Sequence, residues 1–563
     1  MSITLIIFSS SVLIDDIVSR FLPFFKEGEE KEKLLPLALP SYERDQLISI
    51  IGNKRSIGES LKLLFSELKA PRGETTFIDP FCGSGAISRI ARNLGMGVKA
   101  NDNQPFAHLV NYVYLTLTND DLSQMFREMG GIDAYFSLLN LEGLYAYNTE
   151  EPLLGGYLSH HYAPQDDNYY DGQKERLFFT AANARFFDQV RNEVERSLDD
   201  EAERAVVIAA LLYEASRKAN TLGSFTAYQK KFVTEGSLAR RRIVEPPVLR
   251  VPTLVDEPLK RGEVSLMSAA DFLKSTSGDI CYLDPPATVQ QYGNNYHLLN
   301  TITIWDNYRP SEERDSEGNL LDKGGIRRDW RQTYSPFCSL KEADLAFVNL
   351  FGSIDARHIV LTYPAKGIVE IERIYELLEP RHGPVTVIPV AKRNQGGRQS
   401  KGKQNIEYIF VAGKMGNFHL PVESGIELLP LVERLSNLTD RLFKTPQSLP
   451  DYPFIGGLIL DGLPPLEVLL NKEVEQLEWE VEHLEANSCD NLDEGLKVLV
   501  RAILDPNQSE RGKLERRLYP LLRRLDEKVK LERVLKELDW AGGDPSVAER
   551  LREFLVPLIA RKN

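Results

Sequence analysis

Cysteine is scarce in this sequence, and its spacing excludes two common kinds of site. Only four cysteines occur in 563 residues, at positions 82, 281, 338 and 489, with no Cys-x-x-Cys pair. Thiols so far apart form neither a disulfide framework nor a zinc site. We therefore expect no metal centre, and we expect the protein to work in the reducing cytoplasm.

Long apolar runs are missing as well. No stretch reaches the ~18–20 residues that a membrane span needs, so we expect no membrane partner. The short apolar segment 3–8 has no basic flank. It is predicted to be buried and not to act as a signal peptide.

Positive charge is in deficit, with 68 Lys and Arg against 82 Asp and Glu and a net charge of −14. A uniformly cationic surface is excluded, so binding to nucleic acid would require a local basic surface. Hydrophobic residues make up 42% and charged residues 27%, which is typical of a globular protein and excludes wholesale disorder. The length indicates two to four domains.

An α/β pattern begins near residue 47. A short strand at 75–79, a glycine-containing turn, a helix at 87–94 and a strand at 98–102 form one βαβ unit, which predicts a parallel sheet. Short apolar, β-branched runs predict further strands, covered on both faces. These runs are 264–266, 279–283, 358–363, 385–390 and 406–411. Residues 121–250 are mainly helical in pattern, as in 202–219, and the Leu- and Glu-rich region after 420 has helical spacing.

The first motif with chemical meaning is Asp-Pro-Phe-Cys-Gly-Ser-Gly at 79–85, between a strand and a helix. Its glycines allow close approach of a ligand to the backbone at a helix N-terminus. Asp102 ends the next strand, where a carboxylate can accept hydrogen bonds from ribose hydroxyls. The Gly-x-Gly-x-x-Gly spacing and the P-loop lysine are both absent. The expected ligand is a nucleoside without a pyrophosphate, and S-adenosylmethionine fits that description.

The second motif is Asp284-Pro285-Pro286, at the end of the predicted strand 279–283. Two prolines stiffen the turn and remove two amide donors. A carboxylate and carbonyl oxygens remain, and such acceptors suit an amino group whose N–H bonds must be held. A rigid turn without chemistry is the alternative for this tripeptide alone.

Together the two motifs resemble those of the Dam-like N6-adenine-specific DNA methyltransferases, especially those of restriction–modification systems. The resemblance covers roughly residues 45–415. It implies a Rossmann-like S-adenosylmethionine-dependent methyltransferase core with a helical target-recognition insertion and a C-terminal helical domain. The expected division is an N-terminal extension (1–44), a first core part (45–120), the insertion (121–255), a second core part (256–418) and the helical domain (419–563).

The resemblance also implies which residues act. The expected cofactor-binding residues are Lys54, Asp79, Phe81, Gly83, Gly85, Asp102, Asp271 and Phe272. The expected catalytic positions are Asp284, Pro285, Pro286 and Ala287. An adenine rotated out of the duplex would bind with its amino group between the Asp284 carboxylate and the Pro285 carbonyl, and direct methyl transfer would follow without a metal or a covalent intermediate.

Ala287 departs from the family pattern, in which an aromatic residue follows the two prolines. That ring stacks on the extruded base, a contact worth ~1–3 kcal/mol. Either an aromatic residue has been changed to alanine deliberately to disable the enzyme, or the chain is a natural relative with weakened chemistry. We favour the first interpretation because the surrounding motif residues are intact. Tyr292 is a candidate replacement for the ring.

The run 327–331 is an ambiguous candidate for contact with DNA phosphates, because Asp329 can pair with its basic neighbours. Two other basic stretches are candidate contacts to the phosphates of double-stranded DNA. They contribute Arg217, Lys218, Lys230, Lys231, Arg240, Arg241, Lys392, Arg393 and Arg398. The alternative for each is a solvated loop. A cognate restriction or defence protein is a further candidate partner, and the oligomeric state and the DNA sequence that is read stay open.

Three functions are compatible with the sequence. The first is adenine-N6 methylation of DNA in restriction–modification or phage defence, impaired by Ala287. The second is a catalytically silent methyltransferase-fold module that binds DNA and acts with a partner. Cytosine-N4 transfer is disfavoured, because that group usually carries Ser where this chain has Asp284. The region after 420 could extend target recognition, dimerise the protein or bind a partner.

Overall fold

The structure is a computed structural model, and the chain divides into two compact units, 1–358 and 359–563. The residues that it describes are 42–70, 74–149, 153–232, 238–256, 260–393, 404–413, 431, 434, 442–444, 458–459, 476–478, 481–482, 488–489, 500–501, 503–506, 515, 518–519, 522, 528–539 and 543–560. The five-part division expected from the sequence stays a prediction.

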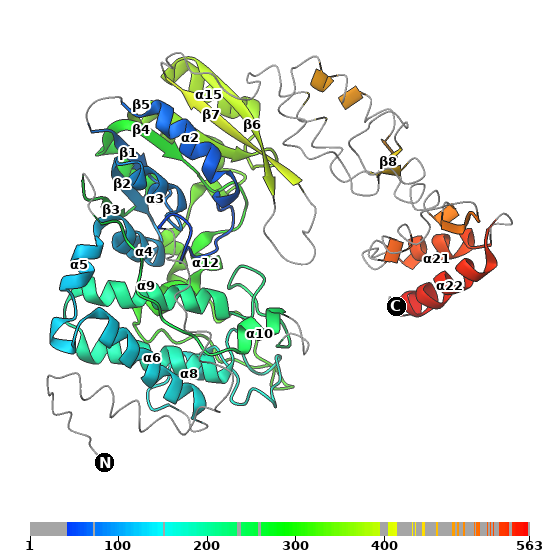
Figure 1. Ribbon diagram of the computed structural model, residues 1–563, viewed down its shortest axis with the longest axis horizontal. Coiled ribbons are helices and arrows are strands. Elements are labelled where there is room, and N and C mark those ends of the chain that lie inside the picture. The colour runs from blue at the N-terminus through cyan, green and yellow to red at the C-terminus, as the bar shows by residue number, and fades with distance from the viewer. Residues whose placement is uncertain are drawn as a thin grey trace. The chain divides into compact units, whose positions relative to one another are not determined.

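A seven-stranded sheet has the strand order β3-β2-β1-β4-β5-β7-β6 (Figure 1). In the first unit, β1 (Thr76–Asp79) pairs in parallel with β2 (Gly97–Asp102) and with β4 (Ser277–Leu283), and β2 pairs in parallel with β3 (Glu263–Leu266). The α/β class and the parallel arrangement predicted from the sequence are therefore confirmed for this part of the sheet.

The second unit makes the sheet mixed. Strand β7 (Gln404–Ala412) is antiparallel to both β5 (Asp355–Pro364) and β6 (Val385–Arg393), a feature that the sequence pattern did not indicate. A helix, α15 (Ile371–His382), lies between β5 and β6 in the chain.

The strand register brings three carboxylates to one edge of the sheet. Asp79 ends β1 and Asp102 ends β2, and Asp284 directly follows β4, whose residue Cys281 pairs with Ile78. Because these three strands are parallel neighbours, their carboxyl ends meet at the same edge, where open α/β sheets bind ligands.

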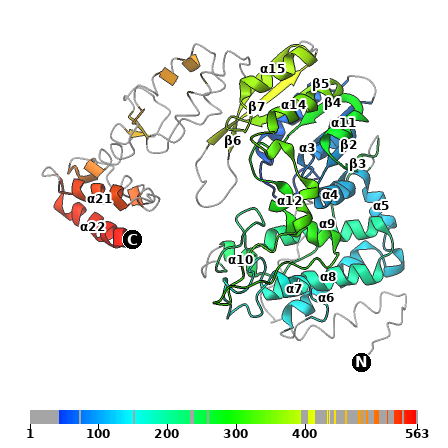
Figure 2. The ribbon, with the colours of Figure 1, turned by 180° about the vertical axis from the view of Figure 1, so that it is seen from behind.

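Helices cover both faces of the parallel strands, as the two views show (Figures 1 and 2). One face carries α2 (Gly58–Leu68), α3 (Ala86–Asn93) and α4 (Pro105–Thr116), and the other carries α11 (Ala269–Lys274) and α14 (Ala343–Gly352). Aromatic packing supports this arrangement. The Phe65 ring of α2 meets Phe77 of β1 edge-on at a centroid distance of 5.0 Å.

The insertion between β2 and β3 is helical, as predicted, and it shares one large core with α4. Its helices are α5 (Asn119–Gln124), α6 (Ile132–Asn148), α7 (Leu158–His161), α8 (Ala181–Ser197), α9 (Glu201–Lys218) and α10 (Leu238–Val244). Helix α9 confirms the helix predicted at 202–219, and it begins at an Asp200 cap that accepts hydrogen bonds from two amides. After β4, the short helices α12 (Tyr292–Asn295) and α13 (His297–Ile304) follow, and α13 packs on α4 and α9.

Short elements complete the described chain. The 3-10 turns are η3 (Arg55–Ile57), η4 (Arg127–Met129), η5 (Arg328–Thr333) and η6 (Pro336–Cys338). In the second unit, β8 (Leu442–Lys444), β9 (Leu458–Ile459) and β10 (Ser488–Cys489) form a small antiparallel sheet, so the described part after 420 is not purely helical. Helices α21 (Lys528–Glu537) and α22 (Pro545–Ala560) contribute to a separate apolar core. Within the described chain, no helix combines the length and apolarity needed to cross a bilayer.

Candidate active site

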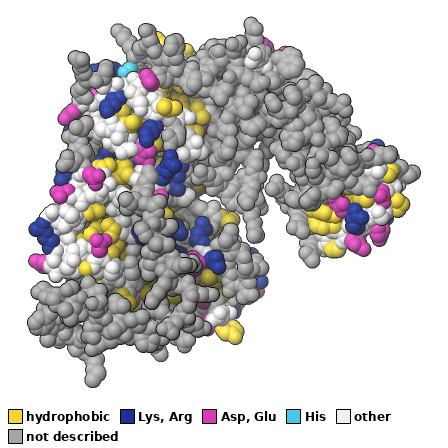
Figure 3. All heavy atoms as spheres, viewed as in Figure 1, with side chains coloured by type: hydrophobic (Ala, Val, Ile, Leu, Met, Phe, Trp, Pro, Cys, Tyr) yellow, Lys and Arg dark blue, Asp and Glu magenta, His cyan; other side chains and the backbone are white. Residues whose placement is uncertain are grey.

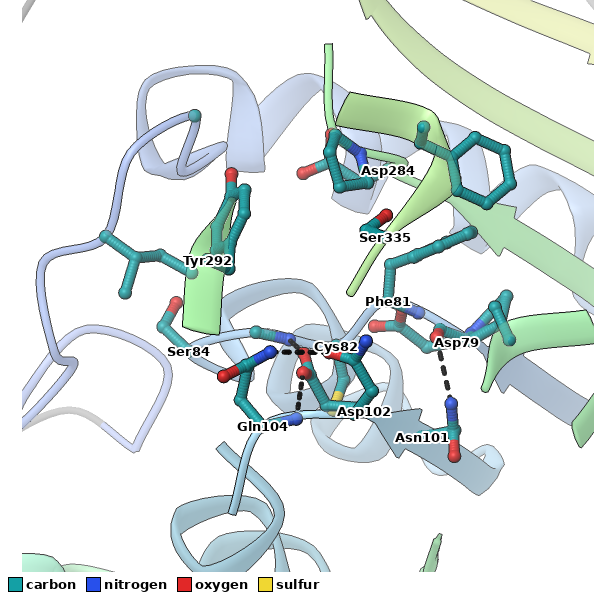
Figure 4. Close-up of a pocket in the computed structure, with 18 of the residues that line it drawn as sticks. Asp79, Phe81, Cys82, Ser84, Asn101, Asp102, Gln104, Asp284, Tyr292 and Ser335 are labelled. Atoms are coloured by element: carbon teal, nitrogen blue, oxygen red, sulfur yellow. Dashed lines mark hydrogen bonds between the residues drawn. The ribbon is translucent and has the colours of Figure 1, made fainter. Parts of the chain in front are cut away.

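A cavity of about 230 Å³ opens at the carboxyl edge of the parallel strands (Figure 4). Its wall combines the glycine loop after β1, Asp102 after β2 and Asp284 after β4 with two segments that lie further away in sequence. Those segments are the turn 50–54 and the strap 333–337. Asp284 and Gly83 thus line one shared cavity, as expected if the glycine loop and the Asp-Pro-Pro motif serve one site.

The two glycines of the loop have different roles. Gly83 lines the cavity with φ +49°, and a Cβ atom built on it would lie 2.6 Å from Ile50 Cδ1. Gly85 has φ +77° and does not line the cavity. A Cβ at Gly85 would lie 2.3 Å from Asn111 Oδ1, so this glycine serves the close approach of the loop to α4. The Asn111 amide also donates to the Gly83 carbonyl at 2.9 Å.

Asp79 is buried behind the loop and holds it in place. Its carboxylate accepts the Ser88 hydroxyl at 2.6 Å and the Phe81 amide at 3.3 Å. Burial raises the pKa of Asp79 to about 7, an effect that these hydrogen bonds only partly offset. Asp79 lines the cavity, and these contacts make it a support of the loop.

Asp102 joins two backbone amides across the cavity floor, as the dashed lines of Figure 4 show. One carboxylate oxygen accepts Gly83 N–H and the other accepts Gln104 N–H, both at 2.9 Å. Burial raises its pKa to about 6. An ionised carboxylate has about four acceptor positions, so two amides leave capacity for the hydroxyls of a bound ribose.

Lys54 and Asp284 form an ion pair that joins the expected cofactor motif to the expected catalytic motif. The distance from Lys54 Nζ to Asp284 Oδ1 is 2.6 Å. The lysine side chain is 4% exposed and the aspartate side chain 22%, so the pair is largely shielded from solvent. Lys54 Nζ also donates to the Gly52 carbonyl at 3.0 Å. Two residues 230 positions apart, each predicted separately, therefore touch.

Two tyrosines hold the turn that carries Lys54. The turn is closed by Asn53 N–H donating to the Ile50 carbonyl at 3.3 Å, with Gly52 at φ +81°. Ile51 N–H donates to the Tyr296 hydroxyl at 2.6 Å, and the Tyr292 hydroxyl donates to the Ile51 carbonyl at 2.8 Å. The backbone N–H and carbonyl of Ile51 are thus both bound by tyrosines of the segment that follows the expected catalytic motif.

The remaining expected cofactor residues lie in different places. Phe81 lines the cavity, with its ring edge-on to Phe337 at 5.3 Å. Asp271 is exposed in the first turn of α11, where it binds Ser268 and Lys274, and Phe272 is 4% exposed. Neither Asp271 nor Phe272 lines the cavity; the residues just before them, Ser268 to Ala270, do. A contact of Asp271 and Phe272 with the cofactor adenine stays a prediction.

Within the expected catalytic motif, Asp284 and Pro286 line the cavity, and Pro285 is buried beside them. Ala287 does not line the cavity and is half-buried. Tyr292 does line it, on the opposite side from Asp284 in Figure 4. The hydroxyl bond to Ile51 fixes Tyr292 in the wall, which weighs against Tyr292 as the replacement stacking ring.

The sequence reasoning missed the strap 333–337. Thr333, Tyr334, Ser335, Pro336 and Phe337 all line the cavity. Gln291 holds the strap through two reciprocal bonds of 2.9 Å, since its amide donates to the Ser335 carbonyl and its side-chain oxygen accepts Ser335 N–H. Asn103 Nδ2 donates to the Thr333 carbonyl at 3.0 Å. The basic run 327–331, just before the strap, does not predict a cavity wall. Its Arg327 is buried in ion pairs with Asp306 and Asp329.

The predicted DNA contacts divide into exposed and buried residues. Lys230, Lys231 and Arg241 are exposed, and Arg217 is partly exposed beside Glu214 at 2.7 Å. Lys218 is 4% exposed, because it lies on the inward face of α9, and burial lowers its pKa. In this structure Lys218 does not reach the surface where a phosphate could meet it.

For Arg240, Lys392 and Arg393 the structure gives the backbone alone, in α10 and β6, and Arg398 lies outside the described residues. On the face drawn in Figure 3, Lys and Arg side chains are interspersed with acidic ones.

Cysteine and metal chemistry were not expected at this site. Cys82, which lines the cavity, is a free buried thiol, and burial raises its pKa, as it does for Cys281 and Cys338. Raised pKa values keep these thiols protonated and poor as nucleophiles. Among the residues that the structure describes, no group of three or more His, Cys, Asp or Glu is placed to hold a metal ion.

Comparison with known proteins identifies the relatives of this chain. Residues 51–311 match the family model of the D12 class N6 adenine-specific DNA methyltransferases. The Type II methyltransferase M.NlaIII of Neisseria lactamica is 27% identical over 377 residues, which are 65% of this chain and 99% of that protein. The Type II methyltransferase M.FokI of Planomicrobium okeanokoites is 26% identical over 427 residues, 74% of this chain and 59% of that protein.

A third relative comes from a virus. The Type II methyltransferase M.CviAII of Paramecium bursaria Chlorella virus 1 is 25% identical over 364 residues, 63% of this chain and 96% of that protein. Methyltransferases of this kind generally use S-adenosylmethionine, and their substrate is DNA. Residues 51–311 are thus similar to the D12 class N6 adenine-specific DNA methyltransferases, and the chain is similar to Type II methyltransferases.

Proposed function

We propose that this chain transfers a methyl group from S-adenosylmethionine to N6 of an adenine that has been rotated out of duplex DNA, and that it belongs to the Dam-like group. The observation that carries the proposal is the shared cavity, in which Asp284 and the glycine loop face one space. A base inside a duplex cannot reach such a recessed site, so extrusion is required, at a cost of a few kcal/mol.

The cavity suits the cofactor. S-adenosylmethionine supplies an electrophilic methyl group on a sulfonium when it is bound. Lys54, Phe81, Gly83 and Asp102 would hold it, with Asp102 accepting ribose hydroxyls and Phe81 contributing an apolar wall. The Gly83 position supports this fit, because a side chain there would fill the space beside Ile50.

Asp284 is proposed to bind the amino group of the target. Its carboxylate can accept several hydrogen bonds, so Lys54 and one N6–H can be held together. The Pro285 carbonyl would accept the other N6–H, and Pro286 keeps the turn rigid. Two fixed acceptors orient the nitrogen lone pair and stabilise the positive charge that develops on it during transfer.

Ala287 is proposed to slow this reaction. A ring at that position would stack on the extruded base, which is worth ~1–3 kcal/mol, and an alanine makes no such contact. The experiment exposes unmodified genomic DNA to the purified protein with methyl-labelled S-adenosylmethionine and maps the modified base. We expect N6-methyladenine from the unchanged protein, more of it from Ala287→Tyr, and a loss of ~100-fold or more from Asp284→Ala, since one preorganised group contributes about that much.

Phosphate contacts from the basic residues are part of the proposal. Arg217, Lys230, Lys231, Arg240 and Arg241 would bind the duplex, together with Lys392, Arg393 and Arg398. A cognate restriction or defence protein would act on the same DNA sequence.

A second candidate function is a catalytically silent module that binds cofactor and DNA and acts with a partner protein. The alanine at 287 favours it. If Ala287→Tyr binds S-adenosylhomocysteine and duplex DNA tightly but transfers no methyl group, the silent module is the better description and the enzymatic proposal fails.

A further inference from the structure

Aromatic side chains gather around the cavity although position 287 has none. The cavity is lined by Phe81, Tyr282, Tyr292, Tyr334 and Phe337. An extruded adenine bound at Asp284 presents a π-face that an aromatic side chain can cover. The structure therefore raises the question of which of these rings is available to a base.

Three of the rings are committed to the core or to each other. Tyr282 is 1% exposed and packs against Phe65 at a centroid distance of 5.8 Å. Phe337 is 6% exposed and lies edge-on to Phe81 and to Phe347, at 5.3 Å from each. A base could stack on Tyr282 or Phe337 only by displacing these contacts.

Tyr292 is committed as well. Its hydroxyl donates to the Ile51 carbonyl, and its ring lies 5.8 Å from that of Tyr296. Rotating Tyr292 toward a base would release the turn that carries Lys54, so the replacement ring must come from elsewhere.

Tyr334 is the remaining ring, and it is open. It lines the cavity while 43% exposed. Its hydroxyl donates to Glu342, which is also exposed, so the ring has an anchor at its far end without being enclosed. A ring that is held but not covered is suited to stacking, because little side-chain freedom is lost when the base arrives.

The chain places Tyr334 next to the catalytic segment. Its neighbour Ser335 makes the two reciprocal bonds with Gln291, and Cys338 Sγ donates to the Gln290 carbonyl at 3.3 Å. The strap therefore runs along the segment that begins at Asp284, and Figure 4 shows Ser335 beside Asp284.

We propose that Tyr334 supplies the stacking contact to the extruded adenine that Ala287 cannot make. This inference rests on the proposed function, because it concerns the same base in the same cavity. The strap is thereby a part of the target-base site that comes from outside the catalytic tetrapeptide.

The experiment is a double-mutant cycle on the two positions. Methyl transfer is measured on a duplex carrying the mapped site for the unchanged protein, Tyr334→Ala, Ala287→Tyr and the double variant. We expect Tyr334→Ala to lower kcat/KM roughly 5- to 150-fold, the range that one base–aromatic contact spans. Tyr334→Phe keeps the ring and should retain activity. As a control, Tyr169→Ala removes an exposed tyrosine of the insertion that does not line the cavity.

A second readout separates stacking from a structural role. In duplexes with 2-aminopurine at the target position, a stacked base is quenched and an unstacked extruded base is bright. With S-adenosylhomocysteine bound, Tyr334→Ala should fluoresce more strongly than the unchanged protein, and the double variant with Ala287→Tyr should be quenched again. Ala287→Tyr should also raise kcat/KM more in the Tyr334→Ala background than in the unchanged one.

Two results would overturn the proposal, and they differ. Equal transfer and equal fluorescence of Tyr334→Ala and the unchanged protein, at a site that both methylate, would remove Tyr334 from the base site and leave the enzymatic function intact. Absence of methylation from both the unchanged protein and Ala287→Tyr would instead overturn the proposed function, and this inference with it.

Discussion

Removal of one hydroxyl group should weaken cofactor binding without touching any residue that contacts the cofactor's reactive methyl. In Tyr296→Phe the ring stays and the acceptor for Ile51 N–H disappears, together with a longer contact of 3.4 Å to the Gly223 carbonyl. A buried donor left without an acceptor costs about 1–3 kcal/mol. The Ile51 amide is only partly buried, so we expect the lower part of that range, about 1–1.5 kcal/mol.

This loss of free energy should weaken binding at the proposed cofactor site. The turn closed by Asn53 and Ile50 forms part of the cavity wall, and its held conformation is the one that presents Lys54. When a fraction of molecules loses that conformation, the apparent affinity falls by the same fraction. We expect the Kd for S-adenosylhomocysteine to rise roughly 5- to 10-fold in Tyr296→Phe, by isothermal titration calorimetry.

A matched variant controls for the loss of any buried tyrosine hydroxyl. Tyr135→Phe removes a hydroxyl that bonds the Ser197 hydroxyl at 2.8 Å between helices of the insertion. Tyr135→Phe should leave the Kd for S-adenosylhomocysteine unchanged. It should lower the melting temperature about as much as Tyr296→Phe does. Equal cofactor affinity in Tyr296→Phe and the unchanged protein would refute the reasoning, as would an equal loss of affinity in Tyr135→Phe.

Two further predictions concern charge. Burial raises the pKa of Asp79 from about 4 in the unfolded chain to about 7 in the folded one. Between these pH values the folded state binds more protons, so the free energy of unfolding should fall as pH rises from about 4 to 7. Asp79→Asn should flatten this pH dependence in urea titrations at about pH 5 and pH 8, and an unchanged dependence would contradict the prediction. The double variant Lys230→Ala/Lys231→Ala should reduce the slope of log Kd for duplex DNA against log salt concentration by up to ~1.8, if both exposed lysines contact phosphates. Lys218→Ala removes a buried lysine and should leave this slope unchanged. Fluorescence anisotropy at several salt concentrations measures the slope for each variant.

The strand framework of the site was predictable because it depends on local patterns. Each predicted strand from 75–79 to 406–411 is present, and the motifs at Asp79 and Asp284 lie at the ends of adjacent parallel strands. Apolar, β-branched runs encode such strands directly, and the parallel arrangement of the βαβ unit then fixes the edge at which their ends meet. No comparable pattern indicated that β7 runs antiparallel to its neighbours, because strand direction depends on connections and not on composition.

Other parts of the site depend on contacts between distant residues, which composition does not encode. Lys218 belongs to a basic stretch, but it follows Glu214 by one helical turn on the inward face of α9, where both are buried. A count of charges cannot distinguish the two faces of a helix. The strap 333–337 has no motif of its own, and its position depends on the amide side chain of Gln291 binding the backbone of Ser335.

The segment after the catalytic motif therefore does more than continue the fold. On one side, Gln291 binds the strap that carries Tyr334, and the Gln290 carbonyl accepts from Cys338, which directly follows the strap. On the other, Tyr292 and Tyr296 bind Ile51 in the turn 50–54. If the site holds a methyl donor and an extruded base as proposed, such preorganisation should raise the rate, because a displacement of about 1 Å can cost ~100-fold. Since both walls are tied to residues 290–296, the position of each is set relative to Asp284 by side chains that take no part in the chemistry.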